Sequence, residues 1–198
     1  MPSDGAQAGS VPDEHPDRLK WNARYAGGFL PSFAPHPLAL RALSMDLPDG
    51  PLIELACGPS GAALVAAANG RRVTAVDVSE IALGMLGHKA RRHGLDHLIT
   101  LVHADLSAWQ PELRSSALVL CTGFWDSEVF AVAAEAVADD GLVGWEAFTV
   151  EARYSRPSLL AEWCLAPGEP ASLLPPDFTL LDQHERGLKR QLLARRQP

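Results

Sequence analysis

A short apolar run over residues 52–56 leads into a loop of small residues that extends to Gly61. Gly58 lets the backbone approach a ligand closely, and Ala56 leaves similar room. Glu54 places a carboxylate at the entrance of this loop, inside an otherwise apolar run. Open α/β sheets bind their ligands in such loops, beyond the carboxyl ends of buried strands. The loop is therefore the first candidate binding site.

A second acidic residue, Asp77, ends the next predicted strand, roughly 20 residues after Glu54. A carboxylate in this place can accept hydrogen bonds from both hydroxyls of a ribose. Asp77 can instead cap the following helix, although Ser79 is the better-placed cap. With Asp77 on a ribose, Val78 would cover one face of an adenine.

The loop is a near match to the glycine fingerprint of dinucleotide-binding folds, with Ala56 in the first glycine position. Two features of the loop argue against binding of a pyrophosphate. Pro59 removes a backbone N–H where phosphate oxygens need donors. Glu54 repels a diphosphate and attracts an ammonium group. A ligand with a cationic amino-acid end, a ribose and no phosphate satisfies both conditions, and S-adenosylmethionine is such a ligand. An NAD-linked oxidoreductase is the less favoured alternative.

The loop from Glu54 to Gly61 and the segment over residues 73–79 resemble motifs I and II of class I S-adenosylmethionine-dependent methyltransferases. Residues 103–106 are similar to the third motif of that family, in which an Asp bonds the adenine amino group. The resemblance implies a Rossmann-like fold, S-adenosylmethionine as cofactor and in-line methyl transfer. Ser60 departs from the family, because most members carry a glycine there. Its Cβ disfavours a positive φ, so we expect a reshaped loop or weaker binding. A non-catalytic S-adenosylmethionine-binding protein is therefore a further alternative.

Two short stretches, residues 21–25 and 165–169, look like the small tellurite-resistance and thiopurine-type methyltransferases. Trp21, Arg24 and Tyr25 have helical spacing and share one face. That face either packs on the sheet or forms a lid over the cofactor, and the subfamily resemblance implies the lid.

The acceptor side of the site is less well defined. Phe124 and Trp125 follow the fourth strand and either line an acceptor pocket or pack against a helix whose cap is Asp126. Arg153 and Tyr154 follow the fifth strand and either contact the acceptor or stay solvated. We find no metal site, no catalytic triad and no residue that stands out as a catalytic base. The candidate cofactor residues are Trp21, Arg24, Tyr25, Glu54, Ala56, Gly58, Asp77, Val78, Asp105, Leu106 and Cys121, and the candidate acceptor residues are Phe124, Trp125, Arg153 and Tyr154.

Alternating strands and helices are expected to position these residues. Strands separated by single helices imply right-handed parallel crossovers. Two further strands, at 177–184 and 188–195, are separated by hairpin spacing. The fold class is therefore α/β: a doubly wound, mostly parallel seven-stranded sheet with a C-terminal antiparallel hairpin. The other predicted strands cover 52–56, 72–78, 98–103, 115–121 and 142–148, and the predicted helices cover 18–25, 37–47, 61–69, 79–93 and 126–138.

Length and composition suit one globular domain. The chain has 198 residues, 47% of them hydrophobic, and a formal net charge of −7, which argues against nucleic-acid binding. We interpret the basic cluster at residues 189–196 as a solvated strand end. We expect a flexible tail over 1–17, then a single domain over 18–198 with a helical lid (18–48) and an α/β core (51–198). Without a signal peptide or an apolar run of about 18 residues, a cytoplasmic monomer or homodimer with a small-molecule acceptor and no membrane contact is expected.

Overall fold

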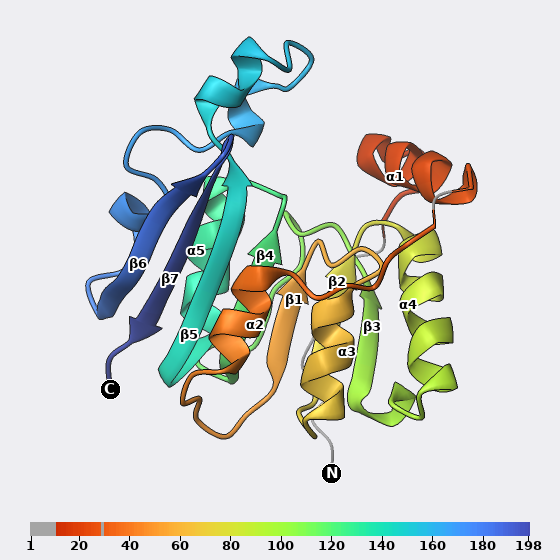
Figure 1. The fold of residues 1–198 in the computed structure, drawn as a ribbon, viewed down its shortest axis with the longest axis horizontal. Coiled ribbons are helices and arrows are strands. Elements are labelled where there is room, and N and C mark those ends of the chain that lie inside the picture. The colour runs from red at the N-terminus through yellow and green to blue at the C-terminus, as the bar shows by residue number, and fades with distance from the viewer. Residues whose placement is uncertain (1–10, 29) are drawn as a thin grey trace.

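The computed structural model of the chain describes residues 11–28 and 30–198. One mixed sheet carries the fold, with the strand order β3-β2-β1-β4-β5-β7-β6 (Figure 1). The strands are β1 (Leu52–Leu55), β2 (Val73–Asp77), β3 (Ile99–His103), β4 (Ser116–Thr122), β5 (Val137–Phe148), β6 (Phe178–Arg186) and β7 (Lys189–Arg196). The helices are α1 (Pro16–Ala26), α2 (Pro37–Leu43), α3 (Gly61–Ala68), α4 (Glu80–Arg92) and α5 (Ser127–Ala136).

The five strands β1 to β5 run parallel, and β7 pairs antiparallel with both β5 and β6. This arrangement confirms the predicted mostly parallel sheet with a C-terminal antiparallel hairpin. Because β1 is the middle one of the five parallel strands and the chain winds outward on both sides of it, the loops after β1 and β4 diverge. A crevice therefore opens at the carboxyl ends of these strands.

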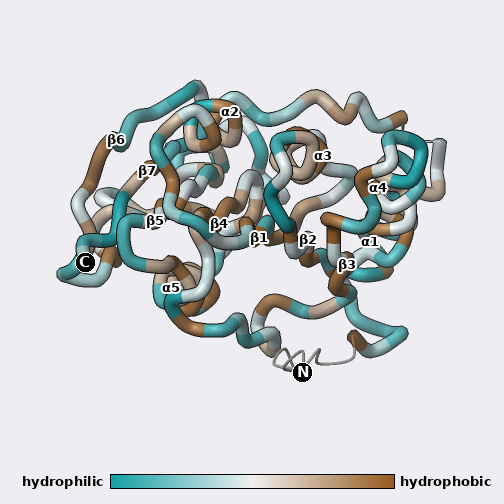
Figure 2. The backbone as a smooth tube through the Cα atoms, turned by 90° about the horizontal axis from the view of Figure 1, so that it is seen from below, coloured by the Kyte–Doolittle hydropathy of each residue, from teal (hydrophilic) through white to brown (hydrophobic). Residues whose placement is uncertain are grey.

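Helices cover both faces of the sheet, with α2, α3 and α4 on one face and α5 on the other (Figure 2). The first face is small-residue rich: Ala62, Ala63 and Ala66 of α3 are buried against Leu52 and Leu118. On the second face, aromatic side chains fill the space that a single helix leaves. There the rings of Trp125, Phe130 and Trp145 pack edge-on or tilted, with centroids 5.2–6.2 Å apart.

Two of the predictions on chain segments need correction. β5 begins at Val137 and not at residue 142, because Val137 pairs with Ser116 directly after α5. The turn-like residues 139–141 form an irregularity inside the strand, where Asp140 has a φ of 62°. The basic cluster is not a solvated strand end either. Arg196 is fully buried and donates to Asp177 and to the carbonyl of Ala134.

The N-terminal region lies above the carboxyl ends of the strands (Figure 1). The expected flexible tail falls partly outside the described residues, which begin at Val11. Val11 is buried, and His15 caps α1. None of the residues of α1 is buried, so the helix rests on the domain without entering the core. The chain then passes over the start of α3, where a Cβ on Gly61 would lie 2.2 Å from the carbonyl oxygen of Phe33.

This close approach predicts opposite effects for two helical glycines. Gly61→Ala should lower the free energy of unfolding by about 1–3 kcal/mol, because the added methyl overlaps the backbone of residues 33–35. Gly84→Ala is the matched control: Gly84 is exposed in α4, no neighbouring atom lies within 4 Å of the Cβ that the change adds, and the variant should gain about 0.5–1 kcal/mol. Urea titrations of both variants measure the difference. Equal free energies of unfolding for the two variants would show that residues 33–35 are not in close contact with the start of α3.

Candidate functional site

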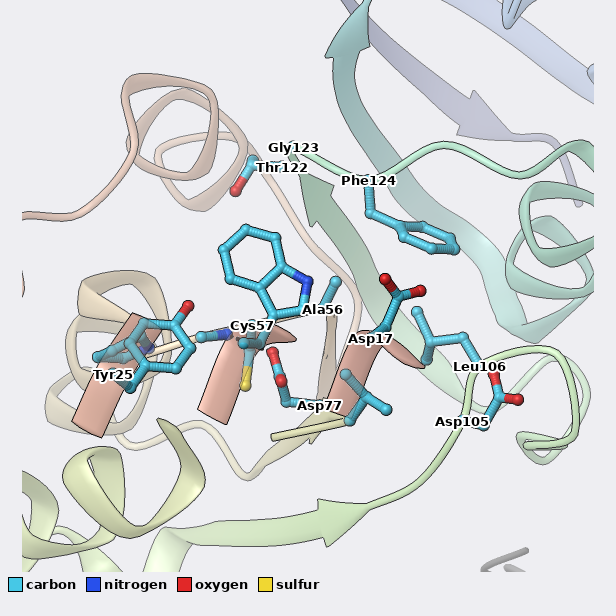
Figure 3. A pocket seen from close by; sticks show the side chains of 14 residues that line it. Asp17, Tyr25, Ala56, Cys57, Asp77, Asp105, Leu106, Thr122, Gly123 and Phe124 are labelled. Carbon is cyan, nitrogen blue, oxygen red and sulfur yellow. Dashed lines mark hydrogen bonds between the residues drawn. The ribbon is translucent and has the colours of Figure 1, made fainter. Parts of the chain in front are cut away.

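A cavity of about 280 Å³ lies at the carboxyl ends of β1, β2 and β4, beneath α1. Figure 3 shows the carboxylates of Asp17, Asp77 and Asp105 around it, with the rings of Tyr25 and Phe124 at its sides. The cavity is lined by Asp17, Trp21, Tyr25, Ala56, Cys57, Gly58, Pro59, Asp77, Val78, Asp105, Leu106, Thr122, Gly123 and Phe124. The structure thus brings most of the predicted cofactor residues, and Phe124 of the predicted acceptor residues, to one place.

The loop after β1 turns through two left-handed residues, Ala56 (φ 47°) and Gly58 (φ 55°). Asp77 holds this loop in place. Its Oδ2 accepts a hydrogen bond from the Gly58 amide at 2.7 Å, and its Oδ1 accepts one from the Ser79 amide at 2.8 Å. One carboxylate therefore connects the ends of two strands, while its outer lone pairs still face the cavity.

Ser60 does not carry the strain that its place in the glycine loop predicted. Its φ is −77°, and it is the N-cap of α3, where its Oγ accepts from the Ala63 amide at 3.1 Å. The same hydroxyl donates to Glu54 Oε2 at 2.6 Å. The left-handed residues of the loop are instead Ala56 and Gly58, so the strain expected at Ser60 is absent, and the alternative expectation of weaker binding stays a prediction.

Glu54 lies beside the cavity without lining it. The side chain is only 4% exposed and points to Ser60. Burial raises the pKa of Glu54 to about 7, although the hydrogen bond from Ser60 works in the opposite direction. A cation bound at the loop would favour the ionised form of this carboxyl group.

Burial also shapes the neighbouring titratable groups. It raises the pKa of Asp77, while the amides of Gly58 and Ser79 oppose the rise. Burial and the nearby Asp77 raise the pKa of Tyr25 to about 12 and that of the Cys57 thiol well above its ordinary value. Cys57 is therefore a neutral thiol at the cavity wall, which does not suit a nucleophile.

Asp105 follows β3 and faces the cavity from the side opposite to the glycine loop. Its two oxygens accept from the amide and the hydroxyl of Ser107 at 3.0 and 2.8 Å. These bonds outweigh burial and lower the pKa of Asp105. His15, at the start of α1, lies 3.3 Å from the same carboxylate. Asp105 is thus an ionised acceptor that a second donor can still reach.

The turn after β4 explains why the side chains of Phe124 and Trp125 point in different directions. The Trp145 indole donates to the Phe124 carbonyl at 2.9 Å, and the Cys121 thiol donates to the same oxygen at 3.8 Å. This fixed turn directs the Phe124 ring to the cavity and buries Trp125 against Phe130. Cys121 is fully buried and does not line the cavity.

The remaining predicted acceptor residues lie elsewhere. Arg153 and Tyr154 belong to the 3-10 helix η2 (Val150–Tyr154) and line a separate surface hollow with Glu151 and Pro157. Arg24 faces the ring of Trp21 at 5.7 Å and is not among the residues that line the cavity. The structure therefore does not bring these three residues together with Phe124.

Sequence reasoning missed Asp17, Cys57, Pro59, Thr122 and Gly123 as lining residues. Thr122 ends the central strand β4, next to β1, so its position in the sheet carried a usable signal. Cys57 and Pro59 belong to a loop that was already singled out. Asp17 had no such signal, because its contact with the cavity depends on how α1 docks.

Polar contacts attach α1 to the domain. Arg18 binds Glu80 with two nitrogens, with Nε–Oε2 and Nη2–Oε1 distances of 3.0 and 2.7 Å. This ion pair lowers the pKa of Glu80 to about 2. Ser79 donates to the Asn22 side chain at 2.6 Å. A helix that is held by surface hydrogen bonds and buries no side chain opens at low cost in free energy.

Within residues 11–28 and 30–198, no three His, Cys, Asp or Glu side chains come together as a metal site. No helix in the same part of the chain has the length and apolar character needed to cross a membrane.

Residues 52–141 match the family described as methyltransferase domain. The match covers the segment from β1 into β5, and therefore every part of the cavity wall except α1. No curated protein matches the chain in sequence.

Several solved structures share the fold. A protein studied for the conversion of a disulfide bond into a thioacetal group during echinomycin biosynthesis is 20% identical, with a TM-score of 0.63 over 91% of this chain and 93% of that chain. Geranyl diphosphate C-methyltransferase from Streptomyces coelicolor is 12% identical, with a TM-score of 0.66 over 81% and 75% of the two chains. An S-adenosylmethionine-dependent methyltransferase from Mesorhizobium loti is 16% identical, with a TM-score of 0.64 over 80% and 96%.

The fold is that of the class I methyltransferases, and the segment that builds the cavity is a methyltransferase domain. Both findings agree with the S-adenosylmethionine site that the loop at Gly58 and the acidic end of β2 predicted.

The buried Glu54 predicts a distinctive pH dependence of stability. Its pKa is about 7 in the folded chain and 4.5 ordinarily, so its favourable contribution is complete below pH 4.5 and is lost as the pH rises through 7. At about 1.4 kcal/mol per pKa unit, Glu54→Gln should be more stable than the wild type by up to about 3 kcal/mol at pH 8, and similar to it near pH 4.5. Urea titrations at pH 4.5, 6 and 8 test this.

Glu146→Gln is the matched control with the opposite sign. Glu146 is also buried, but hydrogen bonds from His36, Lys189 and Gln191 outweigh burial and lower its pKa to about 2. Its contribution is present above pH 4.5 and is lost as the pH falls toward 2. Parallel stability curves for Glu54→Gln and the wild type would show that Glu54 is not buried as described.

Proposed function

We propose that this methyltransferase transfers the methyl group of S-adenosylmethionine to a small-molecule acceptor that enters between α1 and the end of β4. The observation that carries the proposal is the cavity, which combines a positive-φ glycine loop, an acidic strand end and a roof formed by α1. Its volume of about 280 Å³ is near the lower end for small-ligand sites. A cavity of this size favours compact ligands. Helix α1 must move to admit both the cofactor and the acceptor.

The residues present fit the cofactor. At Gly58 a Cβ would lie 3.1 Å from the Tyr25 hydroxyl, so the glycine lets Tyr25 of α1 approach the loop closely. Asp77 offers its carboxylate to the ribose hydroxyls, and Asp105 offers its own to the adenine amino group. Val78 and Leu106 supply the apolar faces on either side of an adenine. Glu54 and the other carboxylates give the loop a negative potential that suits an ammonium group.

When bound, the cofactor supplies a methyl group on a sulfonium, which needs no activation by the protein. The residues of the cavity contribute by positioning and by excluding water. Thr122 at the end of β4 and Phe124 in the turn that follows form part of the cavity wall, where an acceptor can align with the methyl group. No proton transfer by a side chain is required unless the acceptor itself must lose a proton.

We propose that α1 is a lid, as the resemblance of residues 21–25 to the tellurite-resistance and thiopurine-type enzymes implies. Trp21 and Tyr25 line the cavity from this helix, with ring centroids 6.0 Å apart. The polar attachments of Arg18 and Asn22 let the helix lift and close again without disturbing the core.

Asp77→Ala should weaken binding of S-adenosylhomocysteine by about 10–100-fold, because hydrogen bonds to a charged acceptor contribute about 1.5–3 kcal/mol. Isothermal titration calorimetry measures the change, and circular dichroism checks that the variant is folded. Asp139→Ala, which removes an exposed carboxylate paired with Arg114, is the matched control and should bind normally. Unchanged affinity in folded Asp77→Ala would remove Asp77 from the site.

The lid predicts a change in hydrogen exchange. Amides of residues 18–28 should become protected when S-adenosylhomocysteine is added. Arg18→Met should reduce that protection and weaken binding by about 2–5-fold, since a partly exposed ion pair contributes only modestly to the attachment of α1. Arg114→Met, which removes exposed ion pairs far from the cavity, is the control. If protection of 18–28 does not change on binding, α1 is only a packing element.

A further inference from the structure

The ammonium group of Lys20 lies among three groups that together form a cation site. Asp17 Oδ1 is 3.9 Å from Lys20 Nζ, and the rings of Trp21 and Trp163 have their centroids 5.4 and 4.6 Å from it. A carboxylate with two indole faces attracts a cation by charge and by the ring quadrupoles. We refer to Asp17, Trp21 and Trp163 as the cation box.

Two of the three residues of the cation box line the cavity. Asp17 and Trp21 come from α1 and line the cavity. Figure 3 shows the Asp17 carboxylate beside Leu106 and Phe124, on the side where the acceptor is proposed to enter. Trp163 belongs to the 3-10 helix η3 (Ala161–Trp163), in the segment between β5 and β6. That segment and α1 both lie above the carboxyl ends of the strands (Figure 1). The box therefore connects α1, which covers the cavity, with the segment between β5 and β6.

Lys20 occupies the box loosely. Its side chain is 54% exposed, and its distance to Asp17 is at the outer limit of an ion pair. Such a contact contributes little stability and is readily exchanged for another cation. Asp17, Lys20 and Trp21 all belong to α1, so opening of that helix would separate Trp163 from the rest of the box.

The charge of the cavity agrees with a cationic occupant. Three of its lining residues, Asp17, Asp77 and Asp105, are acidic, and among residues 11–28 and 30–198 no lysine or arginine lines it. The proposed cofactor contacts account for Asp77 and Asp105. Asp17 is left for the acceptor, and an anionic acceptor would meet repulsion from all three carboxylates.

We propose that the acceptor of this enzyme carries an ammonium group and that this group replaces Lys20 in the cation box. Lys20 then acts as an internal stand-in, which fills the box until the acceptor binds. Asp17 and Trp163 determine specificity for a cationic acceptor over neutral and anionic ones. This inference rests on the proposed function, because it names the class of acceptor that the same cavity would take.

Two probes of nearly equal shape test the box. Choline carries a quaternary ammonium group, and 3,3-dimethylbutan-1-ol is its neutral isostere. Binding of each to the full chain, with and without saturating S-adenosylhomocysteine, is measured by tryptophan fluorescence and by calorimetry. The wild type should bind choline about tenfold or more tightly than the neutral isostere.

Variants of the cation box distinguish binding of a cationic ligand from a purely structural contact between α1 and η3. Lys20→Met removes the competing ammonium group and should strengthen choline binding by about 3–10-fold, with no effect on the isostere. Asp17→Asn should weaken choline binding by about tenfold, and Trp163→Leu should do so to a similar degree. Lys89→Met is the matched control, because Lys89 makes a comparable contact with the Phe33 ring at 5.5 Å, and it should bind choline like the wild type.

The outcomes are distinguishable. Equal binding of choline and its isostere, or weaker choline binding in Lys20→Met, would overturn the cation box and leave Lys20 as a latch between α1 and η3. Failure of S-adenosylhomocysteine to bind would contradict the proposed function, whatever choline does. Normal S-adenosylhomocysteine binding with no preference for choline would overturn only the inference about the acceptor.

Discussion

The site depends on one buried carboxylate. Asp77 accepts hydrogen bonds from the backbone amides of Gly58 and Ser79. It therefore connects the loop after β1 to the turn that begins α4. Because burial disfavours its charge, the two amide donors are what keep an acidic group in place at the end of β2. The left-handed turn at Ala56 and Gly58 then exposes the loop to the cavity. Loss of this carboxylate would therefore disturb the shape of the loop as well as its contact with a ligand.

The molecule divides into a rigid base and a loosely attached roof. The base is the sheet with its two apolar faces, where residues such as Leu118 and Phe130 are completely buried. The roof is α1, which buries no residue and is attached through Arg18 and Asn22. This division suits the proposed lid role of α1, because the helix can move without any change in the core.

The carboxylates around the cavity favour cationic ligands over anionic ones. A sulfonium cofactor with an ammonium group suits the carboxylates of Asp77 and Asp105 and the buried Glu54, whereas a diphosphate does not. The same argument, applied to Asp17 at the entrance, favours an acceptor that is itself cationic. One physical property, the lack of a basic lining residue in the cavity, therefore bears on the cofactor and on the acceptor.

The sequence by itself determined the sheet, its order of elements and the glycine loop with Asp77, because these depend on local patterns: apolar runs, capping residues and short-range spacing. It also indicated Trp21, Tyr25 and Phe124 as lining residues. Only the tertiary structure decided the rest. Packing against Phe130 took Trp125 away from the cavity, and pairing with Ser116 extended β5 back to Val137. Ser60 has a negative φ because it caps α3. Asp17 lines the cavity, and Trp163 contacts Lys20, only through the docking of two distant segments. Such contacts are long-range, and no local pattern encodes them.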